Sequence, residues 1–587
     1  MPKITFLPQN ITVEALNSEP LLDAARAAGV SAEAPCGGKG VCRKCGIKVI
    51  SGKIDVKSGS YRSGNALLCR SYTADSDAVI EILSGLYGEQ GSFDDGCFIS
   101  ETPIDPPVKQ IELSVSQPAP LDGFSDFDRL QKAFKSNVPL SVLQKLPVKL
   151  RENGGKITAV YHAGSTVIDI AESGGMYGIA ADIGTTTITL WLVDLVTGDI
   201  LSRKTDYNAQ IEFGLDVISR INCAQKNLDE LRGRVLGTIN SLIGAAAAET
   251  GIGAEKIYCA SITGNTVMTH LFLGVCPEYI RLAPYTPAVF SVPEYTAEHT
   301  KLSINANAPV KIAPAVGSYV GGDVVAGALC TPLADERENG IMLFMDIGTN
   351  GEILLGSGEF ILGCACSAGP AFEGGGIECG MRASRGAIDD FKIGEKGEVT
   401  ISTIGGAPPA GICGSGIIAA VAEMKKAGVI DAAGRFSGAM PERIKKGARP
   451  HKFCITDNIT VSEADIENFI RAKGAVFSAC RTLLNNIGLG FGDIEKIYIA
   501  GGFGRYLDIA NAKAVGLLPN VAAEKIIYLG NTSILGAYKI LTSEQNEKLA
   551  KKTADRITYI DLSSEPGYMD EYLAALFLPH TDAGLFG

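Results

Sequence analysis

One four-residue pattern, found twice, constrains the fold of this 587-residue chain more than any other feature. The pattern is Asp-Ile-Gly-Thr, at Asp182–Thr185 and again at Asp346–Thr349, each time after an apolar run. It predicts two buried strands that turn sharply into second strands, Ile188–Leu195 and Ile353–Gly356. Around both copies, residues 176–587 alternate apolar strands with helical stretches and Gly-rich turns, which is typical of an α/β fold.

The chemistry of the two turns favours phosphate binding. Glycines and hydroxyl side chains at a tight turn present N–H and O–H donors to phosphate oxygens. An aspartate at a strand end suits hydrated Mg²⁺, which keeps several waters and takes few carboxylates. We therefore expect Asp182 and Asp346 to act in catalysis with Mg²⁺. The predicted phosphate-binding residues are Gly184, Thr185, Thr186, Thr187, Gly348, Thr349, Asn350 and Gly351. Neither a Walker A loop nor a Rossmann fingerprint is present.

Three further segments fit a nucleotide site. A strand at Ile497–Ala500 runs into Gly501, Gly502, Phe503 and Gly504, where a nucleoside can lie against the backbone. Two stretches with small residues at helical spacing, Gly322–Leu329 and Gly530–Ala537, predict helices that cross closely. Asp323, at the start of the first, either simply stabilises the helix N-terminus or has the water-positioning or basic role that the superfamily resemblance described next implies.

This set of motifs resembles the superfamily of acetate and sugar kinases, heat-shock chaperones and actin. Its phosphate-1 and phosphate-2 motifs match Asp182–Thr187 and Asp346–Glu352, and its adenosine motif matches Ile497–Gly504. The resemblance implies a two-lobed actin/hexokinase-like ATPase over residues 176–587, with ATP and Mg²⁺ between the lobes. A generic α/β protein rich in turns is the alternative.

Four cysteines near the N-terminus have the spacing of metal ligands. They are Cys36, Cys42, Cys45 and Cys69, in the pattern C-x5-C-x2-C-x23-C. Glycines around the first three allow a loop to wrap an inorganic cluster, with the fourth ligand brought in from a distant strand. The pattern favours a [2Fe–2S] cluster. Zinc, which usually takes two C-x2-C knuckles, and unmetallated thiols are the alternatives. The other cysteines are expected to be small buried side chains.

The flanks of this cluster predict a small sheet. Ile4–Leu7 and Ile11–Ala15 alternate as a hairpin, Pro20–Ala28 is a short helix, and Ile47–Ile50 and Ala78–Leu83 are strands. This order resembles the β-grasp [2Fe–2S] ferredoxins. The five-residue first spacing is similar to that of the adrenodoxin-like branch. We assign this domain to residues 1–85.

Between the two functional regions lie a connector and a small unit. Residues 86–107 are acidic and rich in Gly and Pro, as in a linker. That linker either allows a redox domain to move or is a plain spacer. Residues 108–175 predict a small α+β domain for docking or dimerisation. It has a strand at Gln110–Val115, two helices, and a hairpin whose turn holds His162, expected at the surface.

Composition excludes several functions. The net charge of −12 argues against nucleic-acid binding. No signal peptide and no continuous membrane span is visible, so we expect a cytoplasmic protein with reduced thiols and no membrane partner.

Taken together, the ferredoxin-like and ATPase-like parts resemble the reductive activators of corrinoid proteins. Supporting stretches are Asn208–Ile221, Thr263–Met268, Ser367–Gly374 and Ile412–Gly416. The resemblance implies ATP-dependent electron transfer from a [2Fe–2S] cluster to the cob(II)alamin of a partner protein, which restores cob(I)alamin for methyl transfer in anaerobic one-carbon metabolism. It also implies a low-potential electron donor and allows a homodimer. The glycine-rich stretch Ser367–Gly376 either approaches the corrin or lies near the nucleotide.

Three other functions remain open at this stage. One is an activator of radical dehydratases, which also couples this ATPase fold to electron transfer. Another is a small-molecule kinase or amidohydrolase with a regulatory ferredoxin domain. The third is a redox sensor that uses nucleotide only as a ligand.

Overall fold

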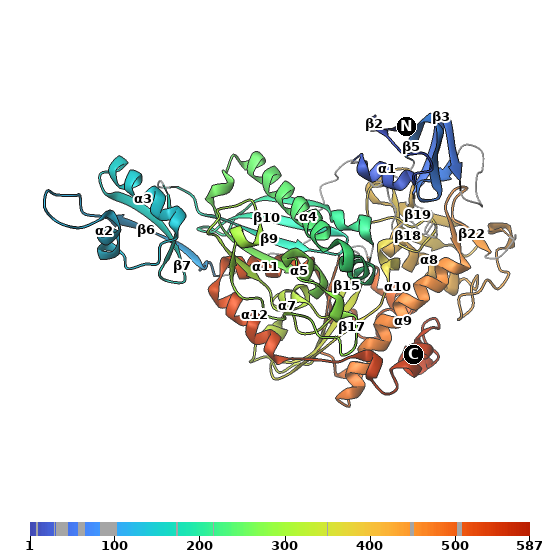
Figure 1. The fold of residues 1–587 in the computed structure, drawn as a ribbon. Coiled ribbons are helices and arrows are strands. Elements are labelled where there is room, and N and C mark those ends of the chain that lie inside the picture. Colours follow the sequence, from blue (N-terminus) through green and yellow to red (C-terminus); the bar gives the residue numbers. More distant parts are fainter. Residues whose placement is uncertain are drawn as a thin grey trace. The chain divides into compact units, whose positions relative to one another are not determined.

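The structure is a computed structural model of residues 1–587. It describes all of them except 8–9, 29, 31–44, 57–64, 83–102, 172–173, 215, 349, 446–450, 502–506 and 587. Contacts divide the chain into two units, residues 1–93 with 209–234, and residues 94–208 with 235–587. Each unit is described by itself (Figure 1). Among the described residues, no helix is long and apolar enough to cross a bilayer.

The N-terminal part of the first unit is a five-stranded sheet of order β2-β1-β5-β3-β4. Strands β1 and β5 are parallel, and Ile4, Phe6 and Ile80 bury the face of the sheet. This confirms the predicted β-grasp domain. Its elements are β1 (Lys3–Leu7), β2 (Ile11–Glu14), α1 (Leu21–Ala27), β3 (Gly46–Val56), β4 (Asn65–Leu67) and β5 (Ser71–Ile82).

A three-stranded sheet, β6-β7-β8, forms the start of the second unit. Two helices pack on it around the buried side chains of Leu130, Val142 and Leu146. The elements are β6 (Val108–Ser114), α2 (Asp126–Ala133), α3 (Leu140–Glu152), β7 (Lys156–His162) and β8 (Thr166–Ala171). We refer to residues 108–171 as the small domain.

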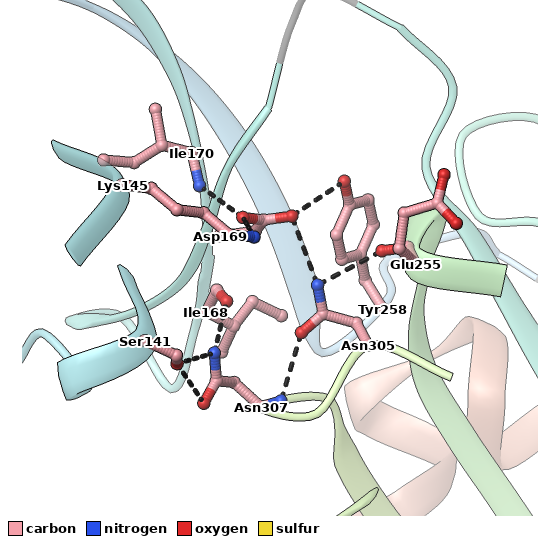
Figure 2. A network of polar contacts seen from close by, with 9 residues as sticks. All are labelled: Ser141, Lys145, Ile168, Asp169, Ile170, Glu255, Tyr258, Asn305 and Asn307. Carbon is pink, nitrogen blue, oxygen red and sulfur yellow. Dashed lines mark hydrogen bonds and ion pairs between the residues drawn. The ribbon is translucent and has the colours of Figure 1, made fainter. Parts of the chain in front are cut away.

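The small domain is bonded to the strands that follow it by a polar network (Figure 2). Buried Asp169 accepts from Asn305 Nδ2 at 3.2 Å and lies 3.5 Å from the Tyr258 hydroxyl. Asn307 Nδ2 donates to Ser141 Oγ and to the Ile168 carbonyl.

His162 is buried, so the prediction that it lies at the surface is wrong. Its Nδ1 lies 2.9 Å from the Pro107 carbonyl oxygen, and its Nε2 lies 2.9 Å from Glu294 Oε1. The partner residue is distant in sequence, which is why the local turn pattern gave no sign of the contact.

Two large sheets follow, and their topology is the same. The first has the order β11-β10-β9-β12-β14-β13, and the second has β17-β16-β15-β24-β25 with β26 added beside β17. In each sheet, three strands that are consecutive in the chain pair antiparallel to one another. Two later strands lie on the other side of the first of these three, and both are parallel to it. This duplication is the arrangement expected of a two-lobed actin/hexokinase-like fold, and we call the two halves the first and second lobes.

The bounds of the first-lobe elements are β9 (Tyr177–Ile183), β10 (Thr187–Asp194), β11 (Ile200–Tyr207), α4 (Val217–Thr250), β12 (Ile257–Gly264), α5 (Thr266–Leu273), β13 (Tyr295–Thr296), α6 (Ala297–Thr300), β14 (Pro309–Ile312) and α7 (Gly322–Ala328).

The second half of the chain contains β15 (Met342–Ile347), β16 (Gly351–Gly356), β17 (Ile361–Cys366), β24 (Lys496–Ala500), α10 (Ile509–Ala514), β25 (Ile526–Gly530), α11 (Thr532–Thr542), α12 (Glu544–Arg556), β26 (Ile557–Tyr559) and α13 (Tyr568–Ala575). Two helices are exchanged between the lobes, because α11 packs on the first sheet and α7 packs on the second. An insertion after β17 adds two three-stranded sheets and two helices, with the elements β18 (Ala387–Ile393), β19 (Val399–Thr403), β20 (Gly411–Ile412), α8 (Gly414–Lys426), β21 (Ile444–Lys445), β22 (Lys452–Cys454), β23 (Thr460–Ser462) and α9 (Glu463–Asn486).

Helices α7 and α11 cross at backbone distance, as their small residues predict. A Cβ atom added at Gly536 would lie 2.2 Å from the Ala326 carbonyl oxygen. One added at Gly327 would lie 2.8 Å from Phe344 Cζ and 2.9 Å from Thr532 Oγ1. The glycines are therefore required by the packing of one helix on the other.

We predict that Gly536→Ala destabilises the second unit, because the new methyl group overlaps the backbone of α7. Overpacking of this kind costs roughly 1–3 kcal/mol. Gly237→Ala in α4 is the matched control, since nothing lies within 4 Å of the added Cβ. That substitution should stabilise its helix by about 0.5–1 kcal/mol. Thermal unfolding of both variants measures the difference, and equal melting temperatures would contradict the close crossing.

Candidate functional site

The first phosphate turn joins β9 to β10 at Gly184–Thr186, and two asparagines fix it. Asn208 Nδ2 donates to the Gly184 carbonyl at 2.9 Å, and the Asn208 N–H donates to the Thr186 carbonyl at 2.9 Å. Asn265 Nδ2 donates to Thr185 Oγ1 at 3.0 Å. Because these bonds occupy the carbonyls of the turn, its conformation is held before any ligand binds.

The second phosphate turn joins β15 to β16. The Gly348 N–H donates to the Asn350 carbonyl at 2.8 Å, and Asp346 lies opposite Glu352 in the strand pairing. A Cβ added at Gly351 would lie 2.7 Å from Cys366 Sγ on the adjacent strand, so this position requires glycine. Thr349 lies outside the described residues.

Asp182 is held by a helix that comes late in the chain but packs on the same sheet as Asp182. Ser533 Oγ donates to its carboxylate at 2.7 Å and Asn531 Nδ2 at 3.3 Å, both from the start of α11. Burial raises the pKa of Asp182, and these donors, together with Thr263, oppose the rise by stabilising the charged form.

Three more carboxylates are grouped with Asp182. Burial is the main cause that raises the pKa of Asp323 to about 8 and that of Asp346 to about 7, and repulsion from Asp182 adds to both. Burial also raises the pKa of Glu352 well above its usual range, with a further contribution from Asp323 and then from Asp346. The structure thus brings the three predicted catalytic aspartates together and adds a glutamate.

Such a cluster of like charges fits a divalent cation with oxygen ligands. Mg²⁺ usually keeps several waters and contacts one or two carboxylates directly. Consistent with that, no three acidic, His or Cys side chains of the described part of the chain are close enough to ligate one metal together. Carboxylates grouped in this way suit a hydrated divalent ion.

The position of Asp323 bears on its two predicted roles. Helix α7 begins at Gly322, with Gly321 at the N-cap, so Asp323 is the second residue of the helix and not its cap. Its Oδ1 accepts from the Val324 N–H at 2.9 Å. The carboxylate is aligned with the helix N-terminus and also faces Asp182 and Asp346, so both roles remain compatible with the geometry.

The predicted adenosine segment begins beside the second phosphate turn. Gly501 has φ +104, and a Cβ there would lie 2.3 Å from the Ile347 carbonyl oxygen. Its N–H donates to the Gly530 carbonyl, and its carbonyl accepts from the Tyr528 hydroxyl at 2.9 Å. Gly502, Phe503 and Gly504 lie outside the described residues.

The loop Ser367–Gly376 lies near the second phosphate turn. Glu373 adds to the raised pKa of Asp346, and its Oε1 lies 3.6 Å from a Cβ built on Gly348. The loop thus lies beside the second phosphate turn, and its two predicted roles stay predictions.

Two of the four predicted cluster ligands are described. Cys45 Sγ and Cys69 Sγ lie 3.1 Å apart, and the Cys69 N–H points to Cys45 Sγ at 3.5 Å. Two adjacent sulfurs and a nearby N–H donor fit ligands of one metal in an iron–sulfur cluster. Cys69 lies in a 3-10 turn, Leu68–Arg70, and not on the expected strand. Cys36 and Cys42 lie outside the described residues.

The remaining cysteines are less uniformly buried than predicted. Cys259, Cys364 and Cys480 are buried, as expected of small apolar side chains, but Cys276 is exposed. The prediction is wrong for Cys276, which lies in a loop after α5.

Four functional candidates were not predicted as such: Asn208, Asn265, Asn531 and Ser533. Asn265 and Asn531 each follow a strand and cap a helix, accepting from Met268 and Ile534 respectively. An asparagine between a strand and a helix is a recognisable N-cap signal. Its second contact, with Thr185 or with Asp182, depends on tertiary structure and has no local signature.

Comparison with known proteins agrees with this architecture. Residues 4–74 match the 2Fe-2S iron-sulfur cluster binding domain. Residues 100–174 match the RACo linker region, 177–336 the RACo middle region, and 340–587 the C-terminal domain of RACo, the ASKHA domain. A corrinoid activation enzyme, RamQ, of Eubacterium limosum is 30% identical, over 94% of this chain and 95% of that protein. The chain belongs to the family of reductive activators of corrinoid proteins.

Two further proteins with related names are also similar to this chain. The [Co(II) methylated amine-specific corrinoid protein] reductase of Methanosarcina barkeri is 27% identical over 68% of this chain and 77% of its own. A solved structure titled reductive activator for corrinoid, iron-sulfur protein is 40% identical and covers both chains completely, with a TM-score of 0.76.

We predict that Asp323→Asn flattens the pH dependence of stability in the cation-free protein. The pKa of Asp323 in the folded state, about 8, lies above its ordinary value of 3.8. Between these two pH values, the carboxyl group of Asp323 carries a proton in the folded state that it has lost in the unfolded state. The contribution of Asp323 to the free energy of unfolding is therefore most favourable at low pH, and it is lost as the pH rises toward 8.

Melting temperatures measured without Mg²⁺ from pH 5 to 8 test this. At pH 8 the variant should melt about 3 °C or more above the unmodified protein, with the gap closing toward pH 5. Asp229→Asn, on an exposed part of α4, is the control and should follow the unmodified curve. Parallel curves for Asp323→Asn would contradict repulsion in the cleft.

Proposed function

We propose that this protein uses ATP to drive one-electron transfer from an iron–sulfur cluster in its N-terminal domain to the Co(II) corrinoid of a separate protein. The observation that carries this proposal is the full-length similarity, at 40% identity, to a reductive activator for a corrinoid, iron-sulfur protein. The matching cluster-binding and ASKHA domains supply the two parts that such a reaction needs.

The cluster is of the [2Fe–2S] type in this proposal, with Cys36, Cys42, Cys45 and Cys69 as ligands. The match of residues 4–74 and the adjacent sulfurs of Cys45 and Cys69 support it. When bound, the cluster accepts and releases one electron at low potential. The chain's own contribution is the ligand set and the N–H of Cys69 directed at sulfur.

The ATPase site is assigned to the two phosphate turns and the cleft carboxylates. Asp182 and Asp346 would hold the waters of Mg²⁺, and the turns at Gly184–Thr187 and Gly348–Gly351 would donate to the phosphates. Gly501, Gly502, Phe503 and Gly504 are assigned to the nucleoside. Asp323 would position or deprotonate the attacking water, which its electrostatic interaction with Asp182 and Asp346 supports.

ATP is needed because reduction of a Co(II) corrinoid is uphill from a ferredoxin-type potential. For one electron, about 59 mV corresponds to a tenfold change in equilibrium, or about 1.4 kcal/mol. A nucleotide that binds one conformation of the complex more tightly than another shifts the equilibrium through that difference in affinity. We infer that a low-potential donor reduces the cluster. We also place the corrinoid in the partner, because this chain has no D-x-H-x2-G corrinoid motif.

Cys45→Ser should abolish the visible absorption and the S = 1/2 signal of the reduced protein, because it removes one sulfur of the ligand pair. ATP binding should persist, since the phosphate turns belong to the other unit. Cys276→Ser is the matched control, an exposed cysteine outside the cluster, and should keep both properties. Purified protein that is colourless and holds zinc would contradict the cluster assignment.

ATP hydrolysis should increase in the presence of a Co(II) corrinoid protein, and that protein should be reduced only when ATP and an electron donor are both supplied. Optical spectra follow the Co(II) to Co(I) change while phosphate release is measured in parallel. The same corrinoid protein held in its methylated Co(III) form is the control. An ATPase that ignores the corrinoid protein, or reduction that proceeds equally without ATP, would contradict the function.

A further inference from the structure

Asn265 lies between strand β12 and helix α5, and its side chain bonds to two other elements at once. It is the N-cap of α5, and its Oδ1 accepts from the Met268 N–H at 2.9 Å. Its Nδ2 donates to Thr185 Oγ1 in the first phosphate turn at 3.0 Å. Asn265 and Thr185 are both buried. One side-chain amide therefore joins the start of a helix to a predicted phosphate-binding residue.

The helix decides which end of this amide faces Thr185. If the amide were turned over, its NH₂ group would face the Met268 N–H, so that two donors would meet and the helix would lose its cap. The oxygen of Asn265 must therefore face Met268, and the nitrogen must face Thr185.

The direction of this bond fixes what the Thr185 hydroxyl can do. A threonine hydroxyl has one proton to donate and two lone pairs that accept. Since Asn265 Nδ2 only donates, the Thr185 oxygen accepts from it, and the Thr185 proton is directed away from Asn265. The hydroxyl is thereby kept as a donor in a turn where phosphate oxygens would need donors.

The backbone around Asn265 is tightly packed. A Cβ added at Gly321, the N-cap of α7, would lie 2.5 Å from Asn265 Cα and 2.8 Å from the Thr266 nitrogen. The Thr266 hydroxyl donates to the Gly317 carbonyl at 2.8 Å. The residues of α5 from Thr266 to Phe272 are buried. Because this backbone has little room to shift, the amide orients Thr185 before a ligand arrives.

An asparagine is not required for capping alone, since aspartate and serine cap helices about equally well. Asn531, the N-cap of α11, uses its amide in the same way: its Oδ1 accepts from the Ile534 N–H, and its Nδ2 donates to Asp182. Both asparagine caps thus donate to the first Asp-Ile-Gly-Thr motif, one to Asp182 and one to Thr185. Helices α2, α9, α10 and α12 are capped instead by Ser125, Ser462, Asp508 and Ser543.

We propose that Asn265 is a positioning residue for nucleotide binding, which holds the Thr185 hydroxyl as a hydrogen-bond donor to a phosphate group. The inference rests on the proposed function for the identity of the ligand, an adenine nucleotide with Mg²⁺. It depends on neither the iron–sulfur cluster nor the corrinoid partner.

Asn265→Asp reverses the bond to Thr185 and so tests the proposal. A carboxylate keeps the cap of α5, but it only accepts, so the Thr185 proton turns toward it and is lost to the phosphate. Isothermal titration of the full-length protein with Mg²⁺-ATP should show binding weaker by roughly tenfold or more, as expected when a hydrogen bond to a charged group is lost.

Asn265→Ser is the milder variant at the same position. It caps the helix without adding a charge, and its side chain is too short to reach Thr185. Its affinity for Mg²⁺-ATP should lie between those of Asn265→Asp and the unmodified protein, because the hydroxyl proton is then free to turn in either direction.

Thr185→Val separates the role of the hydroxyl from the effect of an added negative charge. In a protein that already carries Thr185→Val, the loss of affinity caused by Asn265→Asp should shrink by about threefold or more, because no hydroxyl remains to be turned. Thr185→Ser is the matched control, since it keeps the hydroxyl, and it should bind Mg²⁺-ATP within about threefold of the unmodified protein.

Equal losses of affinity with and without the Thr185 hydroxyl, or full ATP affinity in Asn265→Asp, would overturn the inference and leave the proposed function in place. An unmodified protein that does not bind Mg²⁺-ATP would overturn the ATPase assignment, and this inference with it.

Discussion

The two lobes depend on the backbone contact between α7 and α11. Gly327 and Gly536 remove the side chains that would separate these helices, so the two duplicated sheets approach each other along a line of main-chain atoms. Each helix also begins at the cleft: α7 carries Asp323 in its first turn, and α11 presents Asn531 and Ser533 to Asp182. The same crossing therefore joins the lobes and gathers the polar groups of the candidate nucleotide site.

Gathering these groups has an electrostatic cost. The four partly buried or buried carboxylates of this site repel one another: Asp182, Asp323, Asp346 and Glu352. Hydrogen-bond donors stabilise the charged form of Asp182 more than that of the other three. A divalent cation with its waters would supply the missing positive charge in the proposed nucleotide site. Local destabilisation of this kind is common where a site must respond to its ligand.

Much of this fold could be predicted from the sequence, because the decisive signals are local. β10 was expected at Ile188–Leu195 and spans Thr187–Asp194, since its apolar run is continuous. Helix α3 contains Pro147, which ordinarily ends or kinks a helix, but it continues to Glu152 because Leu146 and Leu150 both pack into the core of the small domain. Tertiary packing outweighs the lost hydrogen bond there.

The sequence alone did not predict the contacts between residues that are far apart in the chain. The burial of His162 depends on Glu294, and the restraint of the phosphate turn depends on Asn208 and Asn265. Asp182 shows this limit most clearly. The local pattern predicts its strand and turn, but its side-chain donors, Asn531 and Ser533, lie 349 and 351 residues later in the chain. Helix α11 follows the second sheet in the chain, but its apolar side chains pack on β9, β10 and β12 of the first sheet. Helix α7 follows the first sheet in the chain, but its apolar side chains pack on β15, β16 and β24 of the second. Each sheet is therefore covered by a helix from the other half of the chain, and this exchange ties the two halves together in a way that no local pattern predicts.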